Sequence, residues 1–343
     1  MPSVVRVDRN VRFLLLSHTF IGAAAVHPGI DDVRVMGRYA YVSYYDDAVS
    51  QRIYILDVAD PATPAVLGHY DPSDYWPFFE VNAANTLLAV GLNHSTSKKV
   101  LLVDVTTKAS PTLAATITEA DKVVALAIRG NYLYVVCVPA AAASYIHIWD
   151  ITTPGTPSDA GTYTYSHSGN AEAHCLALHP MNANYLVNVE GGKYLDIIDV
   201  TTPASPTLAG EYTCGTTFSY AQVWAQGNRA VATSSTRLRL SVCDITTPAT
   251  PAEVEFFVPM PGTLSVTSYA MAISPGGKWV FAVSGDGNAY IWNVEGTPYI
   301  DTTLPPGTTF LDCVFQRGLV FLAADKQGLM IYGVVQFGTP GPD

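Results

Sequence analysis

The sequence predicts an all-β fold, a seven-bladed β-propeller of four-stranded antiparallel blades whose ring is closed by the N-terminal strand. Two observations predict it. One phrase recurs five times and is followed by two degraded copies: an apolar strand, an aspartate, Val or Ile, two small polar residues and two spaced prolines. Successive copies lie roughly 40–50 residues apart, the length of one four-stranded blade. The last copy also stops before a fourth strand, while an unassigned strand pattern stands at the other end of the chain.

The repeated phrase fixes the position of each blade. The copies read IYILDVADPATP, LLVDVTTKASP, IHIWDITTPGTP, DIIDVTTPASP and LSVCDITTPATP, followed by the degraded YIWNVEGTP and MIYGVVQFGTP. Their anchor positions are Asp57, Asp104, Asp150, Asp199, Asp244, Asn293 and Gly333. Five near-identical copies make the repeat a strong signal of a propeller.

Each unit divides in the same way. An inner strand such as residues 123–128 leads through a tight turn at Gly130-Asn131 to a second strand. The third strand ends at the anchor aspartate, which is expected to accept hydrogen bonds from backbone N–H groups just ahead of it. The prolines cannot donate to a ladder, so they end the third strand and begin the fourth at the exposed edge of the blade.

The chain ends explain ring closure. Residues 11–21 contain LLSHTF, which is similar to the fourth strand of the first blade, so they are expected to pair with the last strand at 328–334. We expect a single domain over residues 1–343. Its predicted blades are 26–72, 73–119, 120–166, 167–214, 215–259, 260–305 and 306–340, with the N-terminal strand at 11–21 added to the last.

Composition excludes several classes of function. The net charge is −11, and no basic run occurs, which disfavours nucleic acid as a partner. No segment reaches the roughly 18 apolar residues that span a bilayer. The apolar run Phe13–Leu16 is interrupted by Ser17, His18 and Thr19, so we expect no cleaved signal peptide and no membrane insertion. The five cysteines are widely spaced without CxxC, which indicates neither a zinc site nor a disulfide framework.

The IYILDV, VLLVDV and DIIDVTTP strings resemble the LVIVD-repeat propellers, over nearly the whole chain. The resemblance implies a propeller of the WD-repeat type of architecture and a tendency toward surface and extracellular roles in bacteria and archaea. It implies no conserved catalytic residues, so none is carried over.

The two faces of the predicted disc differ. One face carries the nearly uniform TTPxxP turns, whereas the other carries variable loops such as 44–51 and 92–99. Function on repeat folds usually lies where the loops are individual. The blade connections on this variable face hold aromatic candidates for partner binding, with packing between blades as the alternative. They are Tyr75, Trp76, Phe78, Phe218, Tyr220, Tyr269 and Phe310.

A second candidate site lies near the mouth of the central channel. Aligned copies place acidic residues, a histidine and a glutamine there, which suit a metal or a small polar ligand, although solvated channel walls are commonly polar. These residues are Asp32, Glu80, His174, Gln222 and Asp312. Nucleophilic chemistry by Cys175 with His174 is disfavoured, because adjacent strand residues point to opposite faces. We expect no cofactor and no catalytic metal.

The sequence favours a non-enzymatic propeller that binds protein subunits or surface glycans, as a component of a virion or other assembly, or at the cell surface. An enzyme at the channel mouth, such as a metal-assisted hydrolase or lactonase, is the alternative. The partner, the host and the oligomeric state are left open.

Overall fold

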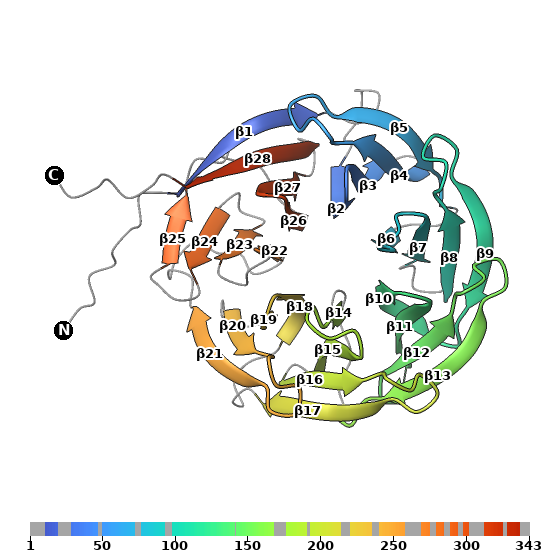
Figure 1. Cartoon of the computed structure of the whole chain (residues 1–343). Coiled ribbons are helices and arrows are strands. Elements are labelled where there is room, and N and C mark those ends of the chain that lie inside the picture. The colour runs from blue at the N-terminus through green and yellow to red at the C-terminus, as the bar shows by residue number, and fades with distance from the viewer. Residues whose placement is uncertain are drawn as a thin grey trace, which may run out of the picture.

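The computed structural model describes residues 11–19, 29–46, 50–72, 77–92, 98–140, 142–167, 176–190, 193–213, 220–234, 240–257, 269–274, 279–284, 289–293, 298–301, 312–324 and 328–336. These residues form β-strands arranged as four-stranded antiparallel sheets around a central axis (Figure 1). The prediction of an all-β propeller with four-stranded antiparallel blades is confirmed. Within the described residues, no helix has the length and apolar character needed to cross a bilayer.

The strands follow one another from the axis to the rim in every sheet. Blade 1 contains β2 (Gly29–Met36), β3 (Tyr39–Asp46), β4 (Ser50–Asp57) and β5 (Ala65–Tyr70). Blade 2 contains β6 (Pro77–Val81), β7 (Leu87–Leu92), β8 (Lys99–Asp104) and β9 (Thr112–Thr118). Blade 3 contains β10 (Lys122–Arg129), β11 (Tyr132–Val138), β12 (Tyr145–Asp150) and β13 (Ser158–Thr164). Blade 4 contains β14 (Leu176–Leu178), β15 (Tyr185–Glu190), β16 (Tyr194–Asp199) and β17 (Thr207–Thr213).

The remaining strands complete the ring in the same order. Blade 5 contains β18 (Tyr220–Gln226), β19 (Arg229–Ser234), β20 (Leu240–Asp244) and β21 (Ala252–Phe257). Blade 6 contains β22 (Tyr269–Ile273), β23 (Trp279–Ser284), β24 (Ala289–Asn293) and β25 (Pro298–Asp301). The last sheet combines β26 (Asp312–Gln316), β27 (Leu319–Ala323) and β28 (Leu329–Gln336) with β1 (Val11–Thr19).

The two ends of the chain share that last sheet. β1 runs antiparallel to β28, from Val11 opposite Gln336 to Thr19 opposite Leu329, with one register shift between Leu15 and Ser17. Figure 1 shows β1 on the rim beside β28. The pairing predicted for the first and last strands is therefore present, and it covers an edge of β28 that would otherwise be exposed.

The anchor aspartates hold the uniform turns as predicted. In five blades the carboxylate Oδ1 accepts the backbone N–H two residues ahead at 2.7–2.9 Å, for example Asp199 from Thr201. The residue after each anchor donates its N–H to a carbonyl of the turn between the first two strands, for example Val200 to Asn184 at 2.7 Å. The two sets of turns are thus joined on one face of the disc.

Neighbouring blades meet at a glycine. Gly68, Gly161 and Gly210 lie on outer strands, each opposite a residue two before an anchor. A Cβ on any of them would come within 2.1–2.4 Å of a carbonyl oxygen in the TTPxxP turn of the next blade. The backbones therefore approach too closely for a side chain, which requires glycine there.

The contact between blades 2 and 3 has the opposite arrangement. Blade 2 has Ala115 in the glycine position of the outer strand, opposite Leu102. The facing turn of blade 3 has Gly155 where blades 4 and 5 have Ala204 and Ala249, and a Cβ on Gly155 would lie 3.9 Å from the Ala114 carbonyl oxygen. The small residue has moved from the strand to the turn, and a groove of about 370 Å³ lies between these blades.

Removal of β1 tests ring closure. We expect a chain lacking residues 1–21 to melt at a lower temperature and to aggregate, because the edge of β28 is then unpaired. Thermal denaturation and light scattering measure both effects. A chain lacking only residues 1–10 keeps β1 and is the matched control. A truncated chain that stays monomeric with an unchanged melting temperature would show that β1 does not close the ring.

The glycine contacts predict a contrast between two substitutions. We expect Gly210→Ala to lower the free energy of unfolding by about 1–3 kcal/mol, because the new methyl group meets the Pro248 carbonyl at 2.2 Å. Gly155→Ala is the control and should have a much smaller effect, because its methyl group meets only the Ala114 oxygen at 3.9 Å. Urea denaturation of both variants measures the difference. Equal losses would contradict the contact.

Candidate functional site in the central channel

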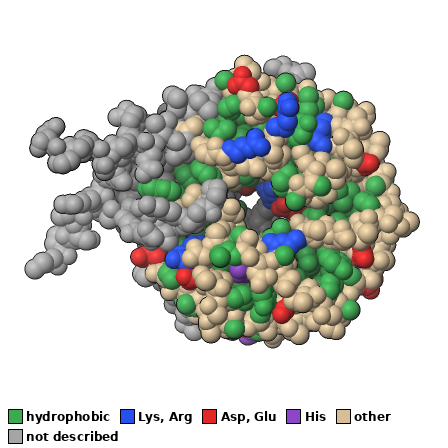
Figure 2. Space-filling model, in the orientation of Figure 1, with side chains coloured by type: hydrophobic (Ala, Val, Ile, Leu, Met, Phe, Trp, Pro, Cys, Tyr) green, Lys and Arg blue, Asp and Glu red, His purple; other side chains and the backbone are tan. Residues whose placement is uncertain are grey.

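The candidate site lies in the central channel, which residues of all seven inner strands line. The channel has a volume of about 600 Å³ and is visible as the hollow at the centre of the disc in Figure 2. One ring, or tier, of equivalent wall residues can be identified from the strand register. In each blade, the residue two positions before the anchor pairs with a residue of the second strand. That residue in turn pairs with the inner-strand residue that belongs to this tier. The tier consists of Arg34, Glu80, Ala127, Ala177, Trp224, Ala272 and Val314. Five members are uncharged, so its formal charges stand side by side on β2 and β6.

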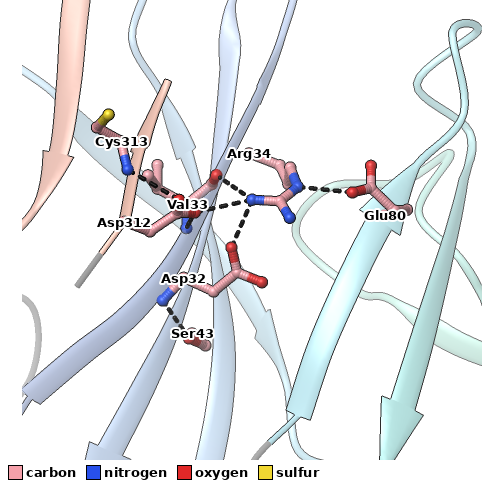
Figure 3. Close-up of polar contacts among 7 residues, drawn as sticks. All are labelled: Asp32, Val33, Arg34, Ser43, Glu80, Asp312 and Cys313. Carbon is pink, nitrogen blue, oxygen red and sulfur yellow. Dashed lines mark hydrogen bonds and ion pairs between the residues drawn. The ribbon is translucent and has the colours of Figure 1, made fainter. Parts of the chain in front are cut away.

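Arg34 is the centre of the polar contacts in the channel (Figure 3). Its Nε donates to Glu80 Oε1 at 2.8 Å, which joins blade 1 to blade 2. Its Nη1 donates to Asp32 Oδ1 at 2.5 Å and to Asp312 Oδ2 at 2.8 Å, which joins blade 1 to the last blade. One guanidinium therefore connects three consecutive blades around the ring.

The two aspartates are further held by the backbone. Asp312 Oδ2 accepts the N–H of Val33 at 2.9 Å, and its Oδ1 accepts the N–H of Cys313 at 2.8 Å. The N–H of Asp32 donates to Ser43 Oγ at 2.9 Å. Both aspartates are buried, whereas the Arg34 and Glu80 side chains are 20% and 29% exposed. The aspartates thus belong to the seam between blades, and only Arg34 and Glu80 face the channel.

The electrostatics follow from three carboxyl groups around one guanidinium. Burial would lower the pKa of Arg34, but Asp32, Glu80 and Asp312 outweigh it and hold this pKa above its usual value. Burial raises the pKa of Glu80, against the opposing effect of Arg34. Burial and the neighbouring Asp32 raise the pKa of Asp312. Fully ionised, the cluster would carry two uncompensated negative charges, and the raised pKa of Asp312 favours retention of a proton instead.

The structure brings together three of the five residues predicted for the channel mouth: Asp32, Glu80 and Asp312. The sequence alignment of Glu80 with Asp32 is wrong by two positions, because Glu80 occupies the place of Arg34 and Phe78 the place of Asp32. His174 lies outside the described residues. Gln222 lies on β18, and its side chain is outside them too.

Sequence reasoning missed Arg34. The signal was present, because an arginine two residues after an aspartate on an inner strand points to the same face of the sheet as that aspartate. The ion pair with Glu80 can be predicted only when β2 and β6 are aligned with each other through the residues that they pair with on β3 and β7. The bulge between Ile30 and Val33 obscures that alignment in the sequence.

The aromatic candidates fall mostly outside the described residues: Tyr75, Trp76, Phe218 and Phe310 do so entirely. Tyr220 and Tyr269 begin β18 and β22, but their side chains are outside the described set. Phe78 is half-buried and lines the channel. Its ring lies so close to Gly91 that a Cβ there would be 2.3 Å from the ring. Phe78 therefore fills the inner wall of blade 2.

The described residues contain no group of three or more His, Cys, Asp or Glu side chains placed to hold a metal ion. Cys137, Cys243 and Cys313 are buried, and burial raises the pKa of the Cys313 thiol well above its usual value. A thiol in that state is a poor nucleophile. His179 is also buried, with Nε2 2.9 Å from the Ile245 carbonyl, so it supports the wall between blades 4 and 5.

Replacement of Arg34 tests whether the cluster holds the ring together. We expect Arg34→Met to lower the free energy of unfolding at neutral pH by about 2–4 kcal/mol, because three carboxyl groups lose their shared cation in a largely buried site. The loss should shrink toward acid pH, where the carboxyl groups are protonated. Arg38→Met, which breaks an exposed ion pair with Asp57, is the control and should lose much less. Equal losses at both positions would contradict this role of Arg34.

The comparisons with known proteins agree with this fold. The LVIVD repeat family matches residues 30–72, 121–164 and 183–214. No curated protein matches the chain. Among solved structures, the β-propeller domain of Cps50 (Swd1) from Myceliophteria thermophila has a TM-score of 0.71 at 12% identity, over 94% of this chain and 100% of that one. Raptor from Chaetomium thermophilum has a TM-score of 0.71 at 12% identity, over 97% of this chain and 30% of that one. The chain is thus a β-propeller that carries LVIVD repeats.

Proposed function

We propose that this protein is a non-enzymatic binding scaffold, a rigid disc of seven blades closed by β1, whose variable face binds a protein partner or a surface glycan. One observation carries the proposal. The charged side chains described in the channel, the place where an enzyme of this fold would hold its substrate, are engaged across the seams between blades: Arg34 and Glu80 with each other, and Arg129 with backbone carbonyls of blade 4.

The Arg34 cluster supports a structural role for those groups. Asp312 uses both carboxyl oxygens to accept hydrogen bonds from the protein. A general base or a metal ligand needs a lone pair directed at the substrate or the ion. Catalysis at Asp312 would therefore require the contacts that join the last blade to blade 1 to break.

The variable face is the proposed binding surface, because its loops differ from blade to blade. The uniform face offers similar turns at five described blades, each held by the same two hydrogen bonds. A specific partner needs an individual surface with a few aromatic anchors. Tyr75 and Trp76 follow the sequence Asp71-Pro72-Ser73-Asp74 and are the anchors that we propose.

The setting that we propose is a virion or other large assembly, or the cell surface. In the first setting the partner is a protein subunit, and a second copy of this chain is the simplest case. In the second setting the partner is a glycan. Both need only a rigid display of loops.

The alternative is an enzyme at the channel mouth, such as a metal-assisted hydrolase or lactonase. The exposed part of Glu80 and the channel volume of about 600 Å³ favour it, since that volume lies in the range of small-molecule sites. Metal analysis of the purified protein separates the two. About one tightly held transition ion per chain would favour the enzyme and overturn the scaffold proposal.

Substitution of the two aromatic anchors tests the binding face. We expect Tyr75→Ala with Trp76→Ala to weaken association at least about tenfold, because each buried aromatic anchor contributes roughly 2 kcal/mol or more. Sedimentation velocity measures association between copies, and a glycan array measures carbohydrate binding. Leu113→Ser on β9, where the side chain is 51% exposed at the rim, is the control. If only the control weakens association, the disc binds through its rim and the aromatic residues serve packing.

A further inference from the structure

One cross-strand row in blade 4 is polar. Asn188 on β15 lies opposite Asp196 on β16, which lies opposite Glu211 on β17. The equivalent row of blade 2 consists of Val90, Leu101 and Thr116. Asn188 and Asp196 are fully buried, and so is Glu190 at the end of β15. Blade 4 thus places polar side chains where blade 2 has mostly apolar ones.

The hydrogen bonds of this row are incomplete within the described residues. Asn188 Oδ1 accepts from the Tyr165 hydroxyl of blade 3 at 2.7 Å, but its Nδ2 has no acceptor. Neither carboxyl oxygen of Asp196 accepts a hydrogen bond, and Oε2 of Glu190 accepts none. A buried carboxylate without donors or a counter-charge is strongly unfavourable, so such a group takes up a proton instead.

The groups that interact with Asp196 come from both blades. Glu190 on β15 and Glu211 on β17 belong to blade 4, and Tyr163 on β13 belongs to blade 3. No lysine or arginine in the described part of the chain forms an ion pair with these carboxyl groups.

His167 connects the two blades at this seam. Its Nδ1 lies 3.7 Å from Glu190 Oε2, and its Nε2 lies 3.7 Å from Glu211 Oε2. Its ring stacks on Tyr194 with centroids 3.6 Å apart and an angle of 11° between the planes. Its backbone N–H donates to Glu190 Oε1. Among the residues that the structure describes, this group consists of three carboxyl groups and the imidazole of His167.

Burial, followed by the neighbouring Glu190, raises the pKa of Asp196 to about 9. In the unfolded chain an aspartate has a pKa of about 3.9. Between these two values the folded protein holds a proton that the unfolded chain has lost, so stability is greatest at acid pH and falls as the pH rises through this range.

We propose that Glu190 and Asp196 form a proton-operated latch between blades 3 and 4. A proton on the Asp196 carboxyl group keeps the seam closed. When the proton leaves to solvent, the new negative charge of Asp196 is buried beside the acidic side chains of Glu190 and Glu211, and the repulsion separates β13 and His167 from blade 4. The latch is a property of this one seam, and it does not depend on which partner the scaffold binds.

The experiment compares pH dependence in the full-length chain. Thermal unfolding is followed from pH 5 to pH 10 for the wild type, for Asp196→Asn and for Asp199→Asn. For the wild type we expect the folding equilibrium constant to fall up to about tenfold per pH unit from this proton. Asp196→Asn removes the titrating group and should flatten that dependence and raise the melting temperature at alkaline pH. Asp199→Asn, on the same strand but in an exposed turn, should keep the dependence of the wild type.

Hydrogen exchange locates the effect. Protection factors are corrected for intrinsic exchange rates. Between pH 6 and pH 9 in the wild type, the amides of β13 should lose at least about tenfold more protection than those of β10. In Asp196→Asn this difference should be absent. Uniform loss over both strands, or equal pH dependence in the wild type and Asp196→Asn, would overturn the latch. A third outcome would also overturn the latch. If millimolar calcium chloride restores the protection of β13 at pH 9 in the wild type but not in Asp196→Asn, the pair is a cation site.

The Glu190→Gln variant covers the case in which Asp196→Asn does not fold. It removes the acidic neighbour of Asp196, and the latch predicts a pH dependence weaker than that of the wild type, although Asp196 stays buried. If neither Asp196→Asn nor Glu190→Gln folds at any pH, the proposal is wrong, because loss of a negative charge at this seam should keep it closed.

Discussion

Burial of every blade on both faces is the constraint on which the rest of this structure depends. A sheet that packs against a neighbour on each side has no solvent-facing surface except at its strand ends and its outer edge. Its second and third strands are therefore apolar at almost every position, as β7 and β11 show. The same constraint makes burial of each polar side chain in a seam unfavourable in free energy, because water cannot supply its hydrogen bonds there. The charged residues that do occur there consequently need partners from the adjacent blade or a bound proton.

The seams solve this problem in two different ways. At the junction of the last blade with blades 1 and 2, Arg34 supplies a permanent positive charge to three carboxyl groups. Between blades 3 and 4 the guanidinium of Arg129 donates to backbone carbonyls of blade 4, and no described lysine or arginine forms an ion pair with Glu190, Asp196 or Glu211, so the proposed latch depends on a bound proton. The first arrangement keeps its positive charge wherever arginine stays charged, whereas the proposed latch depends on a proton bound to Asp196. Two junctions of the same ring can therefore differ in sensitivity while sharing one backbone geometry.

Much of the fold could be predicted from the sequence, because the signals are local and repeated. The anchor aspartates specify their own turns through hydrogen bonds to residues two positions ahead, so the blade boundaries follow from the sequence. The pairing of β1 with β28 was also predictable, since an incomplete unit at one end matched a spare strand at the other. The candidate site was predicted less well. The bulge in β2 shifted the apparent position of Glu80, and the contact of Arg34 with Asp312 spans almost the whole chain. The polar row of blade 4 lies within ordinary strand patterns, and its meaning depends on which blade it faces.

The exchange of glycine and alanine between blades 2 and 3 bears on how such a protein diversifies. Blades of a repeat arise by duplication, and nearly identical units could in principle be reordered or recombined. Between blades 2 and 3, however, the glycine at the contact is Gly155 of the turn. At three other junctions the glycine lies on the outer strand, as Gly68, Gly161 and Gly210. A unit transplanted into a position of the other kind would bring two side chains together or leave two glycines facing a gap. Each blade is therefore matched to its neighbours. The order of the units around the ring is constrained, because moving one unit would also require changes in the blades beside it.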